Sequence, residues 1–232
     1  MVLWPWRMKF TLVVIFTGSP AFAESAETVK VLTAARSLLE LGQISYTYGG
    51  HSVAGDLDVC EKCAVCLDSK HPAPRQRVAI CPSCQNCSLD CSHYIALVFK
   101  RAGLPIPYLD TATMLRLSPS QLLRRYRLLV VDDGVEAVQP GDLLVYRGHV
   151  AMAEAVRGQG YGDILHATSG RAVKGGGHGV QRARQVPFHG VRGPVLRVLR
   201  HLSLQMPGVK STRHLQSRKL RPVKKRRPVQ SN

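Results

Sequence analysis

Acidic residues are missing from the C-terminal part of this sequence. Residues 164–232 contain 16 Lys and Arg and no Asp or Glu, whereas residues 1–163 contain 16 Lys and Arg against 15 Asp and Glu. The net charge of +17 therefore lies almost entirely at one end. A protein built around a nucleic-acid surface spreads its positive charge over the folded part. We therefore expect a nearly neutral domain with a basic extension, and no specific nucleic-acid partner.

Long apolar runs are scarce as well. The N-terminal run over residues 10–16 is too short to span a bilayer as a permanent helix. Arg7 precedes this run, and Ala21 and Ala23 place small residues where signal peptidase cleaves. The pattern predicts a signal peptide over residues 1–23. No twin-arginine pair precedes the run, which favours export in the unfolded state, so we expect a periplasmic or secreted protein after cleavage near Ala23.

The remaining composition suits one folded domain. Hydrophobic residues make up 45% of the 232 residues, which is enough for one packed core. Apolar spacing, glycines and turn residues predict helices first and strands last, which is typical of an α+β domain. The expected helices cover 28–42 (capped by Thr28), 91–103 and 118–129, and the expected strands cover 143–146, 149–156 and 164–167.

The basic end reads as a separate segment. Beyond residue 205 apolar side chains become rare and Lys and Arg dominate, which predicts a disordered tail over 206–232 after a folded domain over 24–205. In a cell envelope, such a tail would meet anionic polymers or lipid head groups through salt-sensitive attraction. A solvated tail without a partner is the alternative.

One cysteine stands where a nucleophile could be activated. Cys91 directly follows Asp90, which can cap a helix, and a thiol in the first turn of a helix is stabilised as the thiolate. A nucleophilic cysteine needs a base, and the base needs an orienting partner. His149 and His166 lie on consecutive predicted strands, where antiparallel pairing can place them side by side.

Five short blocks give this arrangement a family context. Their order resembles that of the NlpC-type bacterial cell-wall cysteine peptidases, a branch of the papain-like superfamily. The resemblance covers about residues 28–170 and implies a papain-like fold, with N-terminal helices packed on a C-terminal antiparallel sheet. It also implies cleavage of peptidoglycan stem peptides, commonly between D-glutamate and the diamino acid. The blocks are YTYGG at 46–50, DCS at 90–92, PGDL at 140–143, GHVAM at 148–152 and LHA at 165–167.

The resemblance implies a Cys-His-His triad. Cys91 would be the nucleophile, His149 the general base and acid, and His166 the group that orients His149. Tyr46 matches the tyrosine before the family's double glycine and is either a donor near the reacting atoms or a packed strand residue. No cofactor is expected for catalysis, and we expect a monomer.

Residues next to the nucleophile set the substrate contacts. Asp90 and Ser92 flank Cys91 and are expected to bind substrate. His93 stands where the family has glycine, and it would crowd the groove or face solvent. Tyr108 stands near the position of a family arginine.

A cysteine-rich insert, residues 51–89, separates the first two blocks. So short an insert cannot bury a core of its own and needs cross-links. Paired CxxC spacing is typical of structural zinc sites, whereas an even number of cysteines in an oxidising compartment suits disulfides. Both interpretations remain open, with the regular repeat favouring zinc. The six residues are Cys60, Cys63, Cys66, Cys81, Cys84 and Cys87.

A different class of protein also fits part of this pattern. Residues 81–91 spell the CxxCxxCxxxC run of bacterial ferredoxins, which would use Cys91 as a cluster ligand. That run calls for proline after its last cysteine, where Ser92 stands, and Lys70 occupies the place of a fourth cysteine after Cys66. The sequence therefore favours an exported cysteine hydrolase. The alternative is an iron–sulfur or zinc-binding envelope protein without hydrolase activity.

Overall fold

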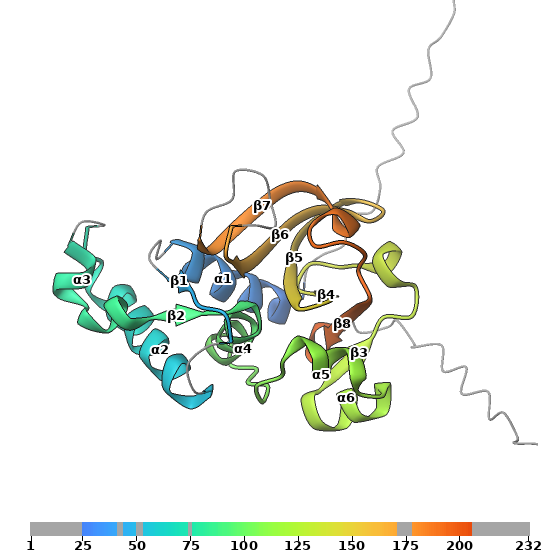
Figure 1. Cartoon of the computed structure of the whole chain (residues 1–232), viewed down its shortest axis with the longest axis horizontal. Coiled ribbons are helices and arrows are strands. Elements are labelled where there is room, and N and C mark those ends of the chain that lie inside the picture. The colour runs from blue at the N-terminus through green and yellow to red at the C-terminus, as the bar shows by residue number, and fades with distance from the viewer. Residues whose placement is uncertain (1–24, 41–43, 50–52, 74–75, 171–177, 206–232) are drawn as a thin grey trace, which may run out of the picture.

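The computed structural model describes residues 25–40, 44–49, 53–73, 76–170 and 178–205 (Figure 1). The predicted signal peptide over 1–23 and the predicted tail over 206–232 lie outside the described residues. Within the described ranges, no helix has both the length and the apolar character needed to cross a membrane. Helices dominate the first half and an antiparallel sheet the second, as expected. The helices are α1 (Ala26–Glu40), α2 (Val53–Lys70), α3 (Arg77–Ile80), α4 (Cys91–Arg101), α5 (Thr111–Arg116) and α6 (Pro119–Tyr126).

The main sheet has six strands in the order β3-β8-β4-β5-β6-β7, and every neighbouring pair is antiparallel. Strands β3, β7 and β8 extend the sheet beyond the three strands that the sequence predicted. Short 3-10 turns at Gly134–Ala137, Phe188–Gly190 and Leu202–Leu204 connect or follow them. The predicted helix over 118–129 is too long, because α6 ends at Tyr126, Arg127 takes a left-handed conformation and β3 begins at Leu128. The strands are β3 (Leu128–Val130), β4 (Leu143–Tyr146), β5 (His149–Gly158), β6 (Tyr161–Thr168), β7 (Gly179–Pro187) and β8 (Arg197–His201).

Both faces of the sheet are buried, because alternate residues of a strand point to opposite faces. Leu143 and Met152 belong to the large core that also contains α1 and α4, whereas Leu144 and Ala151 belong to a second cluster on the other face. Helix α4 packs against β5 and β6, and α1 packs against α4 and β7. The helical layer therefore holds the first residues of α4 against the sheet.

Helix α1 begins earlier than predicted. The Ser25 hydroxyl accepts a hydrogen bond from the Thr28 backbone N–H at 3.1 Å, so Ser25 is the capping residue. The prediction that Thr28 caps this helix is wrong, because Thr28 is buried in the first turn. Leu32 and Leu38 lie on the buried face, as the apolar spacing predicted.

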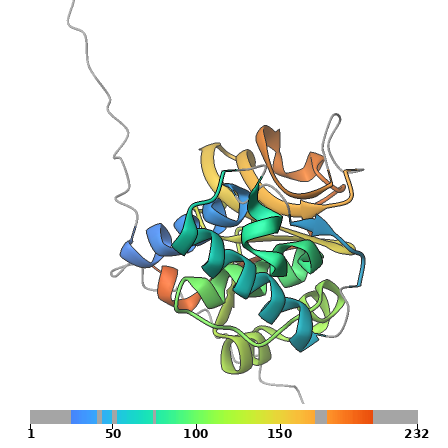
Figure 2. The ribbon, with the colours of Figure 1, turned by 90° about the vertical axis from the view of Figure 1, so that its left-hand side faces the viewer.

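The cysteine-rich insert folds as two antiparallel helical segments joined by three disulfides. Helix α2 carries one cysteine triplet, and the other lies along the 3-10 turn at Pro82–Asn86 and its two flanking residues. Helix α2 also packs against α4 (Figure 2). The pairs are nested: Cys60–Cys87, Cys63–Cys84 and Cys66–Cys81.

These pairings bear on the other interpretations of the insert. A sulfur in a disulfide cannot act as a thiolate ligand, so this oxidised arrangement leaves neither a zinc knuckle nor a ferredoxin-type cluster. Within the described residues, no group of three or more His, Cys, Asp or Glu side chains is placed to hold a metal ion. The preference for zinc over disulfides in the sequence prediction therefore differs from the structure. Zinc binding by the insert stays a prediction.

A small parallel pair, β1 (Ser45–Tyr46) and β2 (Ser88–Leu89), links the N-terminal segment to the start of α4. Gly179, at the start of β7, permits close packing beside it. Its φ of 105° favours glycine, and an added Cβ would lie 2.1 Å from the Ile44 carbonyl oxygen. This approach positions β1 next to the sheet, directly before the residues that lead into Cys91.

Candidate active site

Cys91 is the first residue of α4 and the one cysteine outside the disulfides. Asp90 is the N-cap, and its carboxylate accepts the His93 backbone N–H at 2.8 Å. This confirms the predicted capped helix start. The Cys91 side chain is buried, and the backbone N–H groups of Val150, Ser92 and Cys91 lie close enough to its sulfur to lower the pKa of the thiol. The sulfur therefore lies in a cluster of main-chain donors.

The Val150 contact shows how the sheet reaches the helix. Residues 147–148 form a tight turn between β4 and β5, with Gly148 at a φ of 70°, so that Tyr146 pairs with His149. Strand β5 pairs with β6 from Met152 and Leu165 onwards. The first residues of β5 thus lie beside the N-terminus of α4, which brings the Val150 N–H to the Cys91 sulfur.

The ionisation of Cys91 differs from the expected activated thiolate. Burial raises the pKa of the thiol to about 11, and the neighbouring Asp90 carboxylate adds to the increase. The backbone donors at the helix start lower the pKa, as predicted, but burial outweighs them. At neutral pH the group is therefore a thiol, and it would need a base to act as a nucleophile.

The two predicted histidines are in contact. His149 Nε2 lies 2.9 Å from His166 Nδ1, and the rings meet edge to face. Met152 faces Leu165 across the two strands, so these two side chains share one face. His149 lies three residues before Met152 and His166 one residue after Leu165, so both point to the other face. Both side chains therefore lie on the same face of β5 and β6. The predicted pairing of the two histidines is found in the structure.

The hydrogen bond fixes which nitrogen could act as a base. His149 uses Nε2 for His166, so Nδ1 is the ring nitrogen left for Cys91. For Nδ1 to accept a proton, Nε2 must donate to His166 Nδ1, and the His166 proton then lies on Nε2. That Nε2 is buried and has no hydrogen-bond partner among the described residues.

Burial keeps both histidines neutral. It lowers the pKa of His149 to about 3, with His166 and Arg192 contributing, and it lowers the pKa of His166 to about 4, with Arg192 contributing. The Asp90 carboxylate influences the pKa of both Cys91 and His149, so it lies within electrostatic range of each. In the described part of the chain there is no hydrogen bond between Cys91 and His149. Such contacts commonly tighten only when substrate binds.

The neutral histidines predict a pH-dependent stability. Between about pH 4 and 6.5 they bind protons in the unfolded chain but not in the folded one, so the free energy of unfolding should rise with pH, by up to about 1.4 kcal/mol per pH unit per histidine. Urea unfolding of His149→Gln/His166→Gln should show a flatter pH profile. His201, whose pKa burial also lowers, should retain part of the slope. The exposed-site control His178→Gln should keep the full slope. Parallel profiles for all three proteins would contradict the neutral pair.

Tyr46 is positioned near Cys91 by main-chain pairing. Tyr46 pairs with Leu89, two residues before Cys91, and the Thr47 N–H donates to the Leu89 carbonyl at 3.4 Å. Burial raises the pKa of Tyr46 to about 12, and Cys91 and Asp90 add to the increase. The hydroxyl therefore keeps its proton and can serve as a donor. Its role as a donor near the reacting atoms stays a prediction.

Asp90 and Ser92 make contacts within the protein. Ser92 Oγ donates to Asp90 Oδ1 at 2.8 Å and lies 3.3 Å from the Tyr108 hydroxyl. Although burial opposes it, hydrogen bonds from His93 and Ser92 lower the pKa of Asp90. Both side chains thus shape the start of α4, and their predicted contact with substrate stays a prediction.

His93 takes neither of its expected positions. It is buried and stacks on Tyr108, with ring centroids 4.3 Å apart, so it neither faces solvent nor is free to extend into a groove. Its Nδ1 lies 3.0 Å from Asp90 Oδ1, close enough for an ion pair but outside hydrogen-bond alignment. His93 therefore holds Tyr108 against the helix start.

Arg192 is a site residue that the sequence interpretation missed. It lies in the segment between β7 and β8, and its guanidinium donates to Thr168 Oγ1 at 3.1 Å. Thr168 follows His166 by two residues and lies on the same face of β6. Arg192 also lowers the pKa values of Tyr46, His149 and His166. An exposed cation thus lies within electrostatic range of three site residues, and no local motif marks it.

The described residues include the kinds of group that acyl transfer needs, and the Asp90 carboxylate lies within electrostatic range of both Cys91 and His149. Cys91 offers a nucleophilic sulfur, and the neutral His149 can accept its proton. Main-chain N–H groups and the Tyr46 hydroxyl can donate to a developing oxyanion. These groups come from α4, β1, β5 and β6, so the site requires the whole fold.

Comparisons with known proteins add little. No protein-family model matches the sequence, and no curated protein matches it. Among solved structures, the chain is similar to the P60 domain of an antigen of M. avium subspecies paratuberculosis, with 19% sequence identity and a TM-score of 0.33. The match covers 76% of this chain and 98% of that domain. At that TM-score the likeness carries no argument, so the functional conclusion depends on the geometry of the site.

Proposed function

We propose that this protein is an exported cysteine hydrolase of the NlpC type, with a papain-like arrangement of its site. It would cleave amide bonds in peptidoglycan stem peptides through Cys91, His149 and His166. One observation carries the proposal. The free Cys91, at the start of α4, lies against β5, and the first residue of β5, His149, is hydrogen-bonded to His166. A structural role alone would not require a buried free thiol and a neutral imidazole within electrostatic range of the same carboxylate, Asp90.

The chemistry follows from these groups. His149 Nδ1 takes the Cys91 proton while the sulfur attacks the amide carbonyl carbon, and the oxyanion receives hydrogen bonds from main-chain N–H groups and Tyr46. The C–N bond then breaks, and His149 gives its proton to the leaving amine. Water, deprotonated by His149, attacks the thioester and releases a carboxylic acid and the Cys91 thiol. His166 orients His149 throughout, and no cofactor takes part.

The substrate class comes from the family resemblance, which points to the bond between D-glutamate and the diamino acid. Arg192 supports a substrate with a free carboxylate, because its guanidinium is anchored on Thr168 beside the histidine pair. Arginine binds carboxylates through two parallel N–H donors. A D-glutamate residue linked through its side chain offers such a carboxylate next to the scissile amide.

The place of action is part of the same proposal. Removal of residues 1–23 would deliver the protein to the periplasm or the exterior, where disulfides persist. The basic tail, residues 206–232, would retain it near anionic envelope polymers or lipid head groups. An envelope protein without hydrolase activity remains the second candidate, and the three disulfides disfavour its iron–sulfur form.

The class of reaction can be tested on insoluble peptidoglycan. Incubation with the purified protein should release new free amino groups without new reducing sugar ends, because only amide bonds are cut. Both kinds of new end group can be quantified by chromatography. New amino groups indicate a peptidase, and new reducing ends indicate a glycosidase. Reducing ends alone, or no release at all, would refute the proposed activity.

Arg192 gives a prediction about specificity. Arg192→Gln should raise KM about tenfold for a stem peptide with a free D-glutamate carboxylate, because a charge-assisted contact is lost. The same variant should change KM little for the amidated peptide. Steady-state kinetics on both peptides measures the difference, and an equal change for the two would show that Arg192 does not bind the carboxylate.

A further inference from the structure

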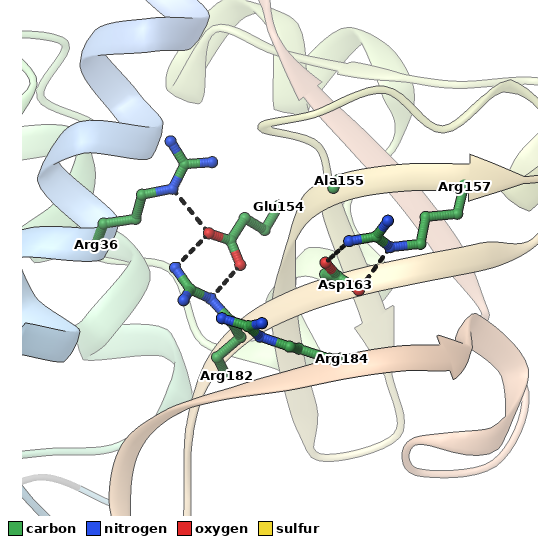
Figure 3. A pocket seen from close by; sticks show the side chains of 7 residues that line it. All are labelled: Arg36, Glu154, Ala155, Arg157, Asp163, Arg182 and Arg184. Carbon is green, nitrogen blue, oxygen red and sulfur yellow. Dashed lines mark hydrogen bonds and ion pairs between the residues drawn. The ribbon is translucent and has the colours of Figure 1, made fainter.

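A second charged site lies on the same sheet, away from Cys91. It is a pocket of about 350 Å³ between α1, β5, β6 and β7 (Figure 3). Four of its lining residues are arginines and two are acids, so its formal net charge is +2. The lining residues are Arg36, Glu154, Ala155, Arg157, Asp163, Arg182 and Arg184.

The two acids are held by three of the arginines. Arg182 donates two hydrogen bonds to the Glu154 carboxylate, at 2.5 and 2.6 Å. Arg36 donates one to the same carboxylate, from Nε at 2.7 Å. Arg157 donates two hydrogen bonds to the Asp163 carboxylate, at 3.1 and 2.7 Å. Both carboxylates are therefore fully engaged, and Figure 3 shows the terminal nitrogens of Arg36 pointing away from Glu154.

Arg184 adds charge that these acids do not neutralise. It is exposed, and its guanidinium has no hydrogen bond or ion pair with the other described residues. It is near enough to contribute to lowering the pKa of Asp163, after the larger effect of the hydrogen bond from Arg157. The pocket thus presents free N–H donors from two elements, α1 and β7.

Irregularities in the strands build this pocket. The β5–β6 register shifts between Ala153 and Ala155, which leaves Glu154 as the extra residue, and the β6–β7 register shifts opposite Asp163. Gln185 has a φ of 53° and donates its N–H to Asp163 at 2.8 Å. Bulges redirect side chains, and a strained non-glycine residue is a sign of a functional constraint.

We propose that this pocket binds a phosphate group, carried by a small molecule or by an envelope saccharide. Phosphate oxygens can accept the free donors of Arg36 and Arg184 together, and guanidinium groups match that geometry. The volume exceeds the space that a phosphate ion needs, so an attached sugar fits as well. The pocket is separate from the Cys91 chemistry and does not depend on it.

Isothermal titration calorimetry on the full chain tests the proposal with two probes, inorganic phosphate and glucose 6-phosphate. Work at about 0.15 M salt screens exposed charges and so limits binding to the basic tail. Wild type and Cys91→Ala should bind with one saturable site. Arg184→Gln should bind about tenfold more weakly, because a charged donor is lost without breaking an ion pair of the fold. Arg36→Gln should also bind more weakly, while Arg182 still holds Glu154.

The matched control is Arg125→Gln, which removes the same charge from an exposed position on α6. It should bind like wild type. Tighter binding of glucose 6-phosphate would identify an esterified phosphate as the ligand, and equal binding would identify the free ion. No saturable binding, or equal affinity for Arg184→Gln and Arg125→Gln, would overturn the proposal.

Discussion

Replacing Cys91 by alanine is expected to reduce the release of amino groups from peptidoglycan by at least about a thousandfold, because the nucleophile is lost. The fold should persist, since the sulfur makes no disulfide and its removal leaves a small void. Thermal unfolding should therefore change little. Activity and melting temperature measured on the same preparation separate a chemical effect from a structural one.

Replacing each of the two histidines should reduce activity to a different extent. His149→Ala should be nearly as severe as Cys91→Ala, because the buried thiol has a pKa of about 11 and needs a base. His166→Ala should be milder, since water can replace part of an orienting contact. Activity retained in Cys91→Ala would end the cysteine-hydrolase assignment. A larger loss in His166→Ala than in His149→Ala would reverse the assigned roles.

Breaking the disulfides is the second change with a large expected effect. Each is expected to contribute about 3 kcal/mol to the free energy of unfolding, since the sequence separations run from 15 to 27 residues. Thiol titration of the unfolded protein without reductant should find one free group, Cys91. Seven thiols with near-stoichiometric zinc would instead support the zinc interpretation of the insert.

The positions of the disulfides allow a matched comparison. Cys87 directly precedes β2, which pairs with Tyr46 and leads into Asp90 and Cys91. Cys60→Ser/Cys87→Ser should therefore lower both stability and activity, the latter about tenfold if the site loses its alignment. Cys66→Ser/Cys81→Ser, at the far end of the ladder, should lower stability alone. Equal loss of activity in both double variants would show that the insert does not position the site.

Much of the site could be predicted from the sequence because its parts depend on local rules. A capping Asp90 fixes the start of α4, and a two-residue turn fixes His149 as the first residue of β5. The consecutive strands then place His166 within 2.9 Å of His149. Each step needs only helix capping, turn geometry and antiparallel pairing.

Other features depend on tertiary context. Burial raises the pKa of Cys91 above the value that its helix position alone would give, and the sequence does not show that burial. Arg192 lies far along the chain from the residues it approaches. Helix α2 was not predicted because residues 51–89 are poor in large apolar side chains, although a spacing of three residues places its cysteines near one face of a helix.

The identity of the broken bond tests the central claim most directly. A synthetic stem peptide containing γ-linked D-glutamate and a diamino acid can be incubated with wild type and with Cys91→Ala, and its products separated and weighed by mass spectrometry. The account predicts two fragments from cleavage between D-glutamate and the diamino acid with wild type, and intact peptide with Cys91→Ala. An intact peptide with both proteins, or the same fragments from both, would contradict it.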